Sequence, residues 1–145
     1  MKSTSKKRVY ILVFNLVLVA LFALPSQSFS QTKHKGLPWP APDEFVKMKN
    51  PVSLGETTIE DGKELYNQQC KSCHGVKGKG DGPKAEKIDI LSGDFTSAEF
   101  TKASDGEMYW KTTEGRKPMP SYKEKLTDKE RWTIIHYIRT FAKSK

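Results

Sequence analysis

The sequence of 145 residues has little of what usually holds a small domain together. It contains only two cysteines and three histidines, and apolar residues make up 36% of it. Two cysteines exclude a framework of several disulfides, and the lack of a second cysteine pair argues against a structural zinc site. The apolar share is below that of ordinary globular chains, so the hydrophobic core must be small. A domain of this size therefore needs additional stabilisation, such as that from a bound metal or a large cofactor.

Several common sequence patterns are also missing. No segment of residues 57–145 alternates convincingly between apolar and polar side chains, and no internal repeat is present. The glycine-rich residues 75–83 do not form a phosphate loop, because no strand precedes them and no Gly-Lys-Ser/Thr follows. The sequence therefore predicts an all-α domain with long loops.

The N-terminus has the organisation of a targeting segment. Residues 1–8 are basic and polar, residues 9–24 are apolar apart from Asn15, and Pro25 is followed by small residues. This order predicts a secretory signal at residues 1–30, cleaved before Gln31. An uncleaved membrane anchor is the alternative, since the apolar run is only marginally short for a spanning helix. Both interpretations place the rest of the chain outside the cytoplasm.

The excess of basic residues is divided between the predicted targeting segment and the rest of the chain. The formal net charge of +8 falls to +4 when the four basic residues of the first 30 are removed. Half of the basic excess thus belongs to the predicted targeting segment. A location outside the cytoplasm also argues against nucleic acid as a partner.

The exported part is predicted to have an arm and a domain. Residues 31–56 form a proline-rich arm, in which Pro38, Pro40 and Pro42 exclude a stable helix or central strand. The arm is either a disordered tether or a segment docked on the domain through Trp39. Residues 57–145 form the domain, with three helices.

Capping boxes predict where these three helices begin. Thr57, Ser104 and Thr127 are each followed three residues later by a glutamate. The first helix is expected over about residues 59–71, and the second is expected to end at Gly115. In the third, apolar residues recur at helical spacing: Ile134, Ile135, Ile138 and Phe141.

Residues 70–74 contain both cysteines of the chain and a histidine next to the second one. Cys70-Lys71-Ser72-Cys73-His74 is the pattern of covalent haem attachment. Two thiols three residues apart at the end of a helix can add to the two vinyl groups of one haem, and the adjacent imidazole then reaches the iron. A thiol–disulfide exchange site is the alternative, but such a motif normally follows a strand, whereas a helix precedes it here.

A second axial ligand is sought among the remaining methionines and histidines. The candidates are Met48, Met108, Met119, His34 and His136. Met108 and His136 lie inside predicted helices, where packing or solvation is the ordinary role. Met119 lies in a loop between Pro118 and Pro120, which stiffen the backbone around it. We therefore predict Met119, whose thioether would raise the potential of the iron.

These residues resemble those of class I c-type cytochromes over about residues 59–145. The shared features are Gly62, Tyr66, Cys70, Cys73, His74, Gly75, Met119-Pro120, Tyr122, Trp132 and Tyr137-Ile138-Arg139. The resemblance implies a bundle of three to five helices around one covalent haem c. It also implies that Gly62 and Tyr66 cross Tyr137, and that the Pro83 carbonyl accepts a hydrogen bond from His74 Nδ1–H. The proline-rich arm and the Gly-Asp-Gly-Pro loop resemble those of exported bacterial monohaem members.

The function expected from this resemblance is one-electron transfer by a haem with His74 and Met119 as its axial ligands. The protein would be a periplasmic carrier between redox proteins, membrane respiratory complexes included, and not an enzyme. Exposed lysines near the haem would steer acidic partners, and the candidates are Lys71, Lys77, Lys79 and Lys117. Two alternatives remain: a cytochrome subunit of an oxidoreductase complex, and a five-coordinate haem that binds a small ligand. Membrane association is expected only through an uncleaved N-terminal segment.

Overall fold

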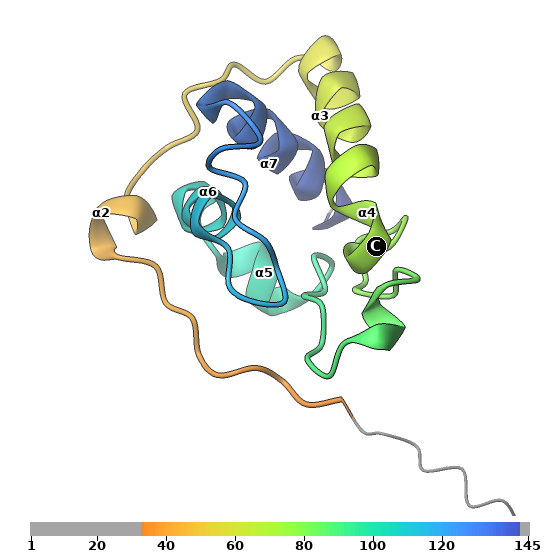
Figure 1. Cartoon of the computed structure of the whole chain (residues 1–145). Helices are drawn as coiled ribbons and strands as arrows, with labels where there is room; N and C mark the ends of the chain where they lie inside the picture. Colours follow the sequence, from red (N-terminus) through yellow and green to blue (C-terminus); the bar gives the residue numbers. More distant parts are fainter. Residues whose placement is uncertain (1–32, 143–145) are drawn as a thin grey trace, which may run out of the picture. The chain divides into compact units, whose positions relative to one another are not determined.

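The computed structural model describes residues 33–142, and over this range it is helical without a β-strand. The prediction of an all-α fold is therefore confirmed. The α-helices are α2 (Asp43–Val46), α3 (Glu56–Gln69), α4 (Lys71–His74), α5 (Ala98–Lys102), α6 (Asp105–Glu114) and α7 (Asp128–Ala142), with a 3-10 turn at Ala85–Lys87. Three of them, α3, α6 and α7, are long, and the others are short segments that connect or cap them (Figure 1).

The predicted signal segment, residues 1–30, lies outside the described residues. Within residues 33–142, no helix is both long enough and apolar enough to cross a membrane.

The helix starts follow the predicted capping boxes in two of three cases. Ser104 accepts a hydrogen bond from the Glu107 amide at 3.1 Å, so α6 begins as expected. At α7, the Thr127 hydroxyl and the Glu130 carboxylate satisfy each other's backbone amides. The expected capping box at Thr57 is wrong. There α3 begins at Glu56. Its N-cap is Gly55, two residues before Thr57, and the extended backbone of Gly55 occupies this position without any side-chain bond.

Helices α3 and α7 cross at Gly62. A β-carbon at this position would lie 2.6 Å from the carbonyl oxygen of Thr133 and 2.9 Å from Cβ of Tyr137. The two backbones therefore approach as closely as they do only because residue 62 has no side chain. One turn further along α3, the fully buried ring of Tyr66 lies 5.3 Å from that of Tyr137. The crossing implied by the family resemblance is thus present.

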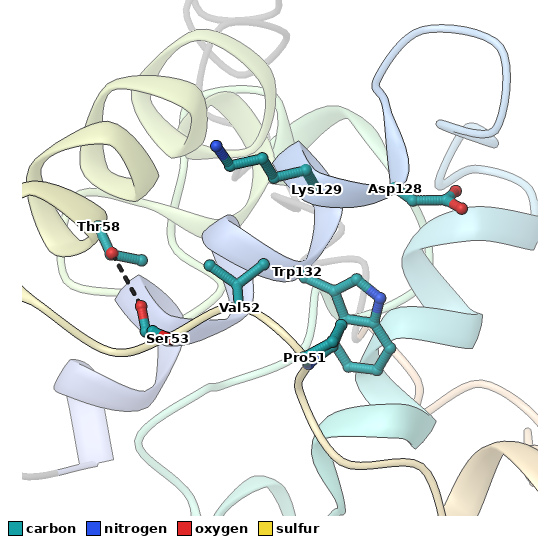
Figure 2. A pocket seen from close by; sticks show the side chains of 7 residues that line it. All are labelled: Pro51, Val52, Ser53, Thr58, Asp128, Lys129 and Trp132. Atoms are coloured by element: carbon teal, nitrogen blue, oxygen red, sulfur yellow. Dashed lines mark hydrogen bonds between the residues drawn. The ribbon is translucent and has the colours of Figure 1, made fainter.

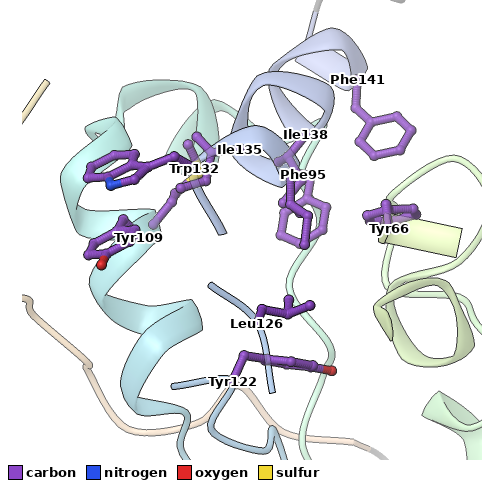
Figure 3. Packing of buried hydrophobic residues seen from close by; sticks show 11 residues of the cluster. Tyr66, Phe95, Tyr109, Tyr122, Leu126, Trp132, Ile135, Ile138 and Phe141 are labelled. Carbon is purple, nitrogen blue, oxygen red and sulfur yellow. The ribbon is translucent and has the colours of Figure 1, made fainter. Parts of the chain in front are cut away.

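Aromatic side chains make up much of the small core (Figure 3). Tyr109 of α6 and Trp132 of α7 stack with ring centroids 4.1 Å apart and nearly parallel planes. On the other side of α7, Phe141 packs against Tyr66 at 5.3 Å. Aromatic rings bury large apolar areas per residue, which compensates in part for the low apolar content of the chain.

The proline-rich arm is docked on the helices and is not a free tether. Trp39 packs against Trp110 of α6 with ring centroids 5.7 Å apart. The single-turn helix α2 also brings Phe45 to the indole of Trp110. Further along, the Asn50 side chain donates to the carbonyl of Trp132 at 2.9 Å. Figure 1 shows the arm passing α2 and continuing to the start of α3. The arm and the helices therefore form one compact unit.

Candidate haem site

The two cysteines and His74 lie on one helical turn. Helix α3 ends at Gln69, and the chain bends at Cys70 before α4 carries Cys73 and His74. The amides of Cys73 and His74 both donate to the Cys70 carbonyl, at 3.2 and 3.0 Å. Both thiols are free and partly buried. Burial raises the pKa of Cys70 to about 12, and the neighbouring Cys73 adds to this shift. The turn thus presents two free thiols and one imidazole together.

The imidazole of His74 is fixed by the segment that contains Gly93. Nδ1 of His74 lies 3.2 Å from the Gly93 carbonyl oxygen, which can only accept, so Nδ1 carries the proton. Phe95 stacks on the ring with centroids 4.5 Å apart. Burial lowers the pKa of His74, although the bond to Gly93 opposes this effect. A neutral imidazole protonated on Nδ1 has Nε2 available for a metal.

The expected role of Pro83 is therefore wrong, because Gly93 is the acceptor for His74 Nδ1. The chain around Pro83 is bonded instead to the backbone of the cysteine turn. The Gly82 amide donates to the carbonyl oxygen of Cys73 at 3.1 Å, and the Lys84 amide donates to the carbonyl oxygen of Ser72 at 2.8 Å. Neither Gly93 nor Phe95 was predicted to act in the site. No local motif marks either residue, since their contact with His74 depends on how a 19-residue loop returns to the turn.

The glycine-rich loop wraps closely around the same turn. Gly75, Gly78 and Gly80 all have positive φ angles, of 81°, 68° and 76°, which glycine adopts without strain. The Gly80 amide donates to the His74 carbonyl at 2.9 Å, and the buried Tyr66 hydroxyl donates to the Gly75 carbonyl at 2.7 Å. These bonds hold the backbone on both sides of His74.

The loop that carries Met119 is tied to the cysteine turn through Tyr122. Met119 is partly buried against the core cluster, and its amide donates to the Arg116 carbonyl at 2.9 Å. The buried Tyr122 hydroxyl donates to the carbonyl of Gln69, the residue before Cys70, at 2.7 Å. Burial raises the pKa of Tyr122 to about 12, and both cysteine thiols contribute. Met119 and the thiols are thus attached to one scaffold.

The other four candidate ligands lie in the core, on the arm or in contacts between segments, outside the cysteine turn. Met108 is 5% exposed within the core, as its helical position predicted. Nε2 of His136 lies 2.7 Å from the carbonyl of Val52, so this histidine fastens the arm to α7. Met48 is 40% exposed on the arm. His34 pairs through its backbone with the segment around Ile90. None of these residues is placed on the cysteine turn or the Met119 loop.

An open groove of about 610 Å³ lies elsewhere, between the arm and the first turn of α7 (Figure 2). It is lined by Pro51, Val52, Ser53, Thr58, Asp128, Lys129 and Trp132. None of the predicted site residues lines this groove. Its one hydrogen bond drawn in Figure 2 joins Thr58 to the Ser53 carbonyl and serves the junction between the arm and α3.

The residues present fit a covalently attached haem. Two free thiols and an imidazole protonated on Nδ1 share one turn, and a thioether lies on a loop fastened to that turn. The hydroxyl of Thr113 is buried without a hydrogen-bond partner among the described residues, and a polar group on a bound cofactor would satisfy it. No group of three metal-ligating side chains of the kind that holds zinc occurs within residues 33–142.

Several solved structures are similar to this chain, among them the following two. One is a chain titled "Kuenenia stuttgartiensis reducing HAO-like protein complex Kustc0457/Kustc0458", with 36% identity and a TM-score of 0.58 over 73% of this chain and 51% of that chain. This chain therefore spans about half of the length of that protein. The other, titled "KustC0563 c-type cytochrome", is 36% identical with a TM-score of 0.50 over 56% of this chain and 96% of that chain. The comparison with curated proteins gave no match.

The family comparison covers the helical domain and the whole candidate site. The model of the family described as "Cytochrome c" matches residues 59–142, which include the cysteine turn, the Met119 loop and α7. Proteins of this family hold haem c covalently and transfer electrons with it. From the site geometry and this match together, we conclude that the chain belongs to the cytochrome c family.

Proposed function

We propose that this protein is an exported one-electron carrier of the periplasm with one haem c. Cys70 and Cys73 would hold the haem through thioether bonds, and His74 Nε2 and Met119 Sδ would ligate its iron. When bound, the haem supplies reversible one-electron chemistry by cycling between Fe(III) and Fe(II). The role of the chain is to fix both ligands and to present the site to redox partners.

The hydrogen bond between His74 and Gly93 carries this proposal. It selects the tautomer that leaves Nε2 for a metal, and it holds the ring at an angle set by backbone rather than by a mobile side chain. Phe95 limits rotation of the same ring by stacking on it. An imidazole held this way changes little between two oxidation states of a ligated iron, which suits electron transfer.

The proposed ligand set also separates a carrier from an enzyme. With a histidine and a methionine bound to the iron, no coordination position is left for a substrate. Partners are then selected by the surface around the site. Lys77, Lys79 and Lys117 are exposed and Lys71 is partly buried, which supports electrostatic steering of acidic partners.

The test is the intact mass and N-terminal sequence of the protein recovered from the periplasm. The proposal expects the mass of the chain from Gln31 onward plus one haem, and a ferric spectrum that contains the long-wavelength absorption band of methionine-ligated haem. Ready binding of carbon monoxide by the ferrous protein would contradict it and favour a five-coordinate, ligand-binding haem. A mass without haem would favour thiol–disulfide exchange.

A second candidate function is that of a cytochrome subunit in an oxidoreductase complex. It is favoured by the similarity to a chain of a complex, of which this chain spans about half. The chemistry of the site is the same in both cases, so the two functions differ in assembly. Purification from the native membrane and periplasmic fractions separates them: a carrier is recovered alone, whereas a subunit is recovered with a larger catalytic protein.

A further inference from the structure

The N-terminal arm contacts the loop that carries Met119 through Arg116. Nη1 of Arg116 donates to the carbonyl oxygens of Leu37 and Pro38, at 2.8 and 3.3 Å. The guanidinium also lies over the indole of Trp39, 4.7 Å from the ring centroid. Three consecutive residues of the arm therefore hold one side chain, by hydrogen bonds and by a cation–π contact.

The arm that makes these contacts is itself anchored on both sides. Before them, the His34 amide donates to the Asp89 carbonyl at 3.3 Å and its carbonyl accepts from the Leu91 amide at 3.2 Å. After them, Phe45 packs on Trp110 of α6 with ring centroids 6.4 Å apart. Gly36 lies so close to Arg116 that a β-carbon there would be 3.3 Å from Nη2. The arm therefore offers Arg116 a fixed support and not a mobile one.

The loop is short between Arg116 and Met119. Helix α6 ends at Glu114, its C-cap Gly115 has a φ of 64°, and Arg116 follows directly. The Arg116 carbonyl accepts the Met119 amide at 2.9 Å, and the two residues form an isolated antiparallel bridge. Beyond Met119, the Ser121 hydroxyl returns to the Thr113 carbonyl at 2.6 Å. On the N-terminal side of Met119, the hydrogen bonds of Arg116 connect the loop to the arm.

We propose that Leu37, Pro38 and Trp39 clamp Arg116 and thereby hold the Met119 thioether against the iron. Arg116 is a positioning residue in this arrangement, because it acts through the backbone of Met119. The inference rests on the proposed role of Met119 as an axial ligand. Its consequence is that the arm sets how readily an external ligand displaces the methionine.

The test uses the haem-loaded full chain and imidazole as the probe. Imidazole replaces a methionine ligand only when the loop opens, so its apparent affinity for the ferric protein reports the opening. Arg116→Gln and Trp39→Ala should each raise this affinity about fivefold, the effect of one partly exposed charged hydrogen bond or cation–π contact. Arg116→Lys keeps the charge but not the two-carbonyl geometry, so it should fall between the wild type and Arg116→Gln.

Lys117→Gln is the matched control. It removes one positive charge from the same exposed loop, so a general charge effect would change both variants equally. Since Arg116 is exposed, its substitution is expected to leave the fold intact, and circular dichroism checks this for each variant.

The outcomes separate the clamp from the ligand assignment. A methionine band in the wild type, with raised imidazole affinity in Arg116→Gln and Trp39→Ala but not in Lys117→Gln, supports the clamp. The same band with unchanged affinity in Arg116→Gln and Trp39→Ala overturns the clamp alone. A wild-type protein without the band overturns Met119 as a ligand, and the clamp with it.

Discussion

His74 Nδ1 lies 3.2 Å from the carbonyl oxygen of Gly93, a residue 19 positions further along the chain. This contact leaves Nε2 as the imidazole nitrogen available to a metal, and it uses a backbone acceptor that no side-chain substitution removes. It also joins the cysteine turn to the segment that places Phe95 on the ring. The same geometry sets the expected behaviour of the site variants.

Replacement of His74 should prevent formation of a stable haem-loaded protein. In His74→Ala the thiols remain, but the imidazole nitrogen proposed to ligate the iron is lost. His136→Ala is the control, because that imidazole lies 2.7 Å from the Val52 carbonyl oxygen, where the arm meets α7. Haem staining and the intact mass of the recovered protein should show loss of haem for the first variant and retention for the second. Equal haem content in both would contradict the assignment.

Met119→Ala should lower the reduction potential and allow carbon monoxide to bind the ferrous protein. A thioether ligand favours Fe(II), and axial ligands tune haem potentials over a range of about 0.8 V. Redox titration therefore measures the change directly. Met48→Ala, on the exposed part of the arm, removes a thioether elsewhere and should leave the potential unchanged. A wild-type potential in Met119→Ala would show that another group is the ligand.

Tyr122→Phe should loosen the connection between the Met119 loop and the cysteine turn. The variant removes the 2.7 Å hydrogen bond to the Gln69 carbonyl and leaves that acceptor without this partner. The expected loss of stability is about 1–2 kcal/mol, the usual cost of a buried hydrogen bond. Denaturant unfolding of the haem-loaded protein measures it. Tyr137→Phe, whose hydroxyl belongs to a half-buried ring, serves for comparison and should cost less.

Gly62→Ala should be more disruptive than its single added methyl group suggests. The new β-carbon would meet the Thr133 carbonyl at 2.6 Å, and backbone on α7 cannot move aside without shifting the whole helix. We expect a loss of about 1–3 kcal/mol from overpacking, measured as a lower unfolding midpoint. Lys63→Ala, at the next and exposed position of α3, should change stability by no more than about 0.5 kcal/mol. Similar midpoints for the two variants would show that the crossing tolerates a side chain.

The capping carboxylate of Glu130 should make a small part of the stability depend on pH. Hydrogen bonds from the Thr127 amide and hydroxyl lower the pKa of Glu130 below its ordinary value of 4.5. A lowered folded-state pKa means that the contribution is present above about pH 4.5 and is lost as the pH falls through the folded pKa. Glu130→Gln should therefore reduce stability at pH 6 by a few tenths of a kcal/mol, a size fitting an exposed site. Thermal unfolding should show this difference shrinking below pH 4.5.

The sequence by itself was enough to predict the chemistry of the site. Covalent haem attachment requires two thiols and an imidazole within five consecutive residues, so Cys70, Cys73 and His74 are visible without a fold. Two of the three long helices were also predicted to begin where they do, because Ser104 and Thr127 cap their own helices through contacts three residues away. Interactions of this kind join residues close together in the chain, so they can be predicted from the sequence without knowledge of the fold.

The tertiary structure alone decided the contacts between distant segments. The sequence suggested Pro83 as the partner of His74, but the fold brings Gly93 to the imidazole and bonds the chain around Pro83 to the cysteine turn. It also docks Trp39 on α6 and places Leu37 and Pro38 on Arg116, 79 and 78 residues away. A backbone carbonyl is an equally good acceptor in every residue. Which carbonyl meets a given side chain therefore depends on how the packed helices return their loops, and not on the identity of the residue.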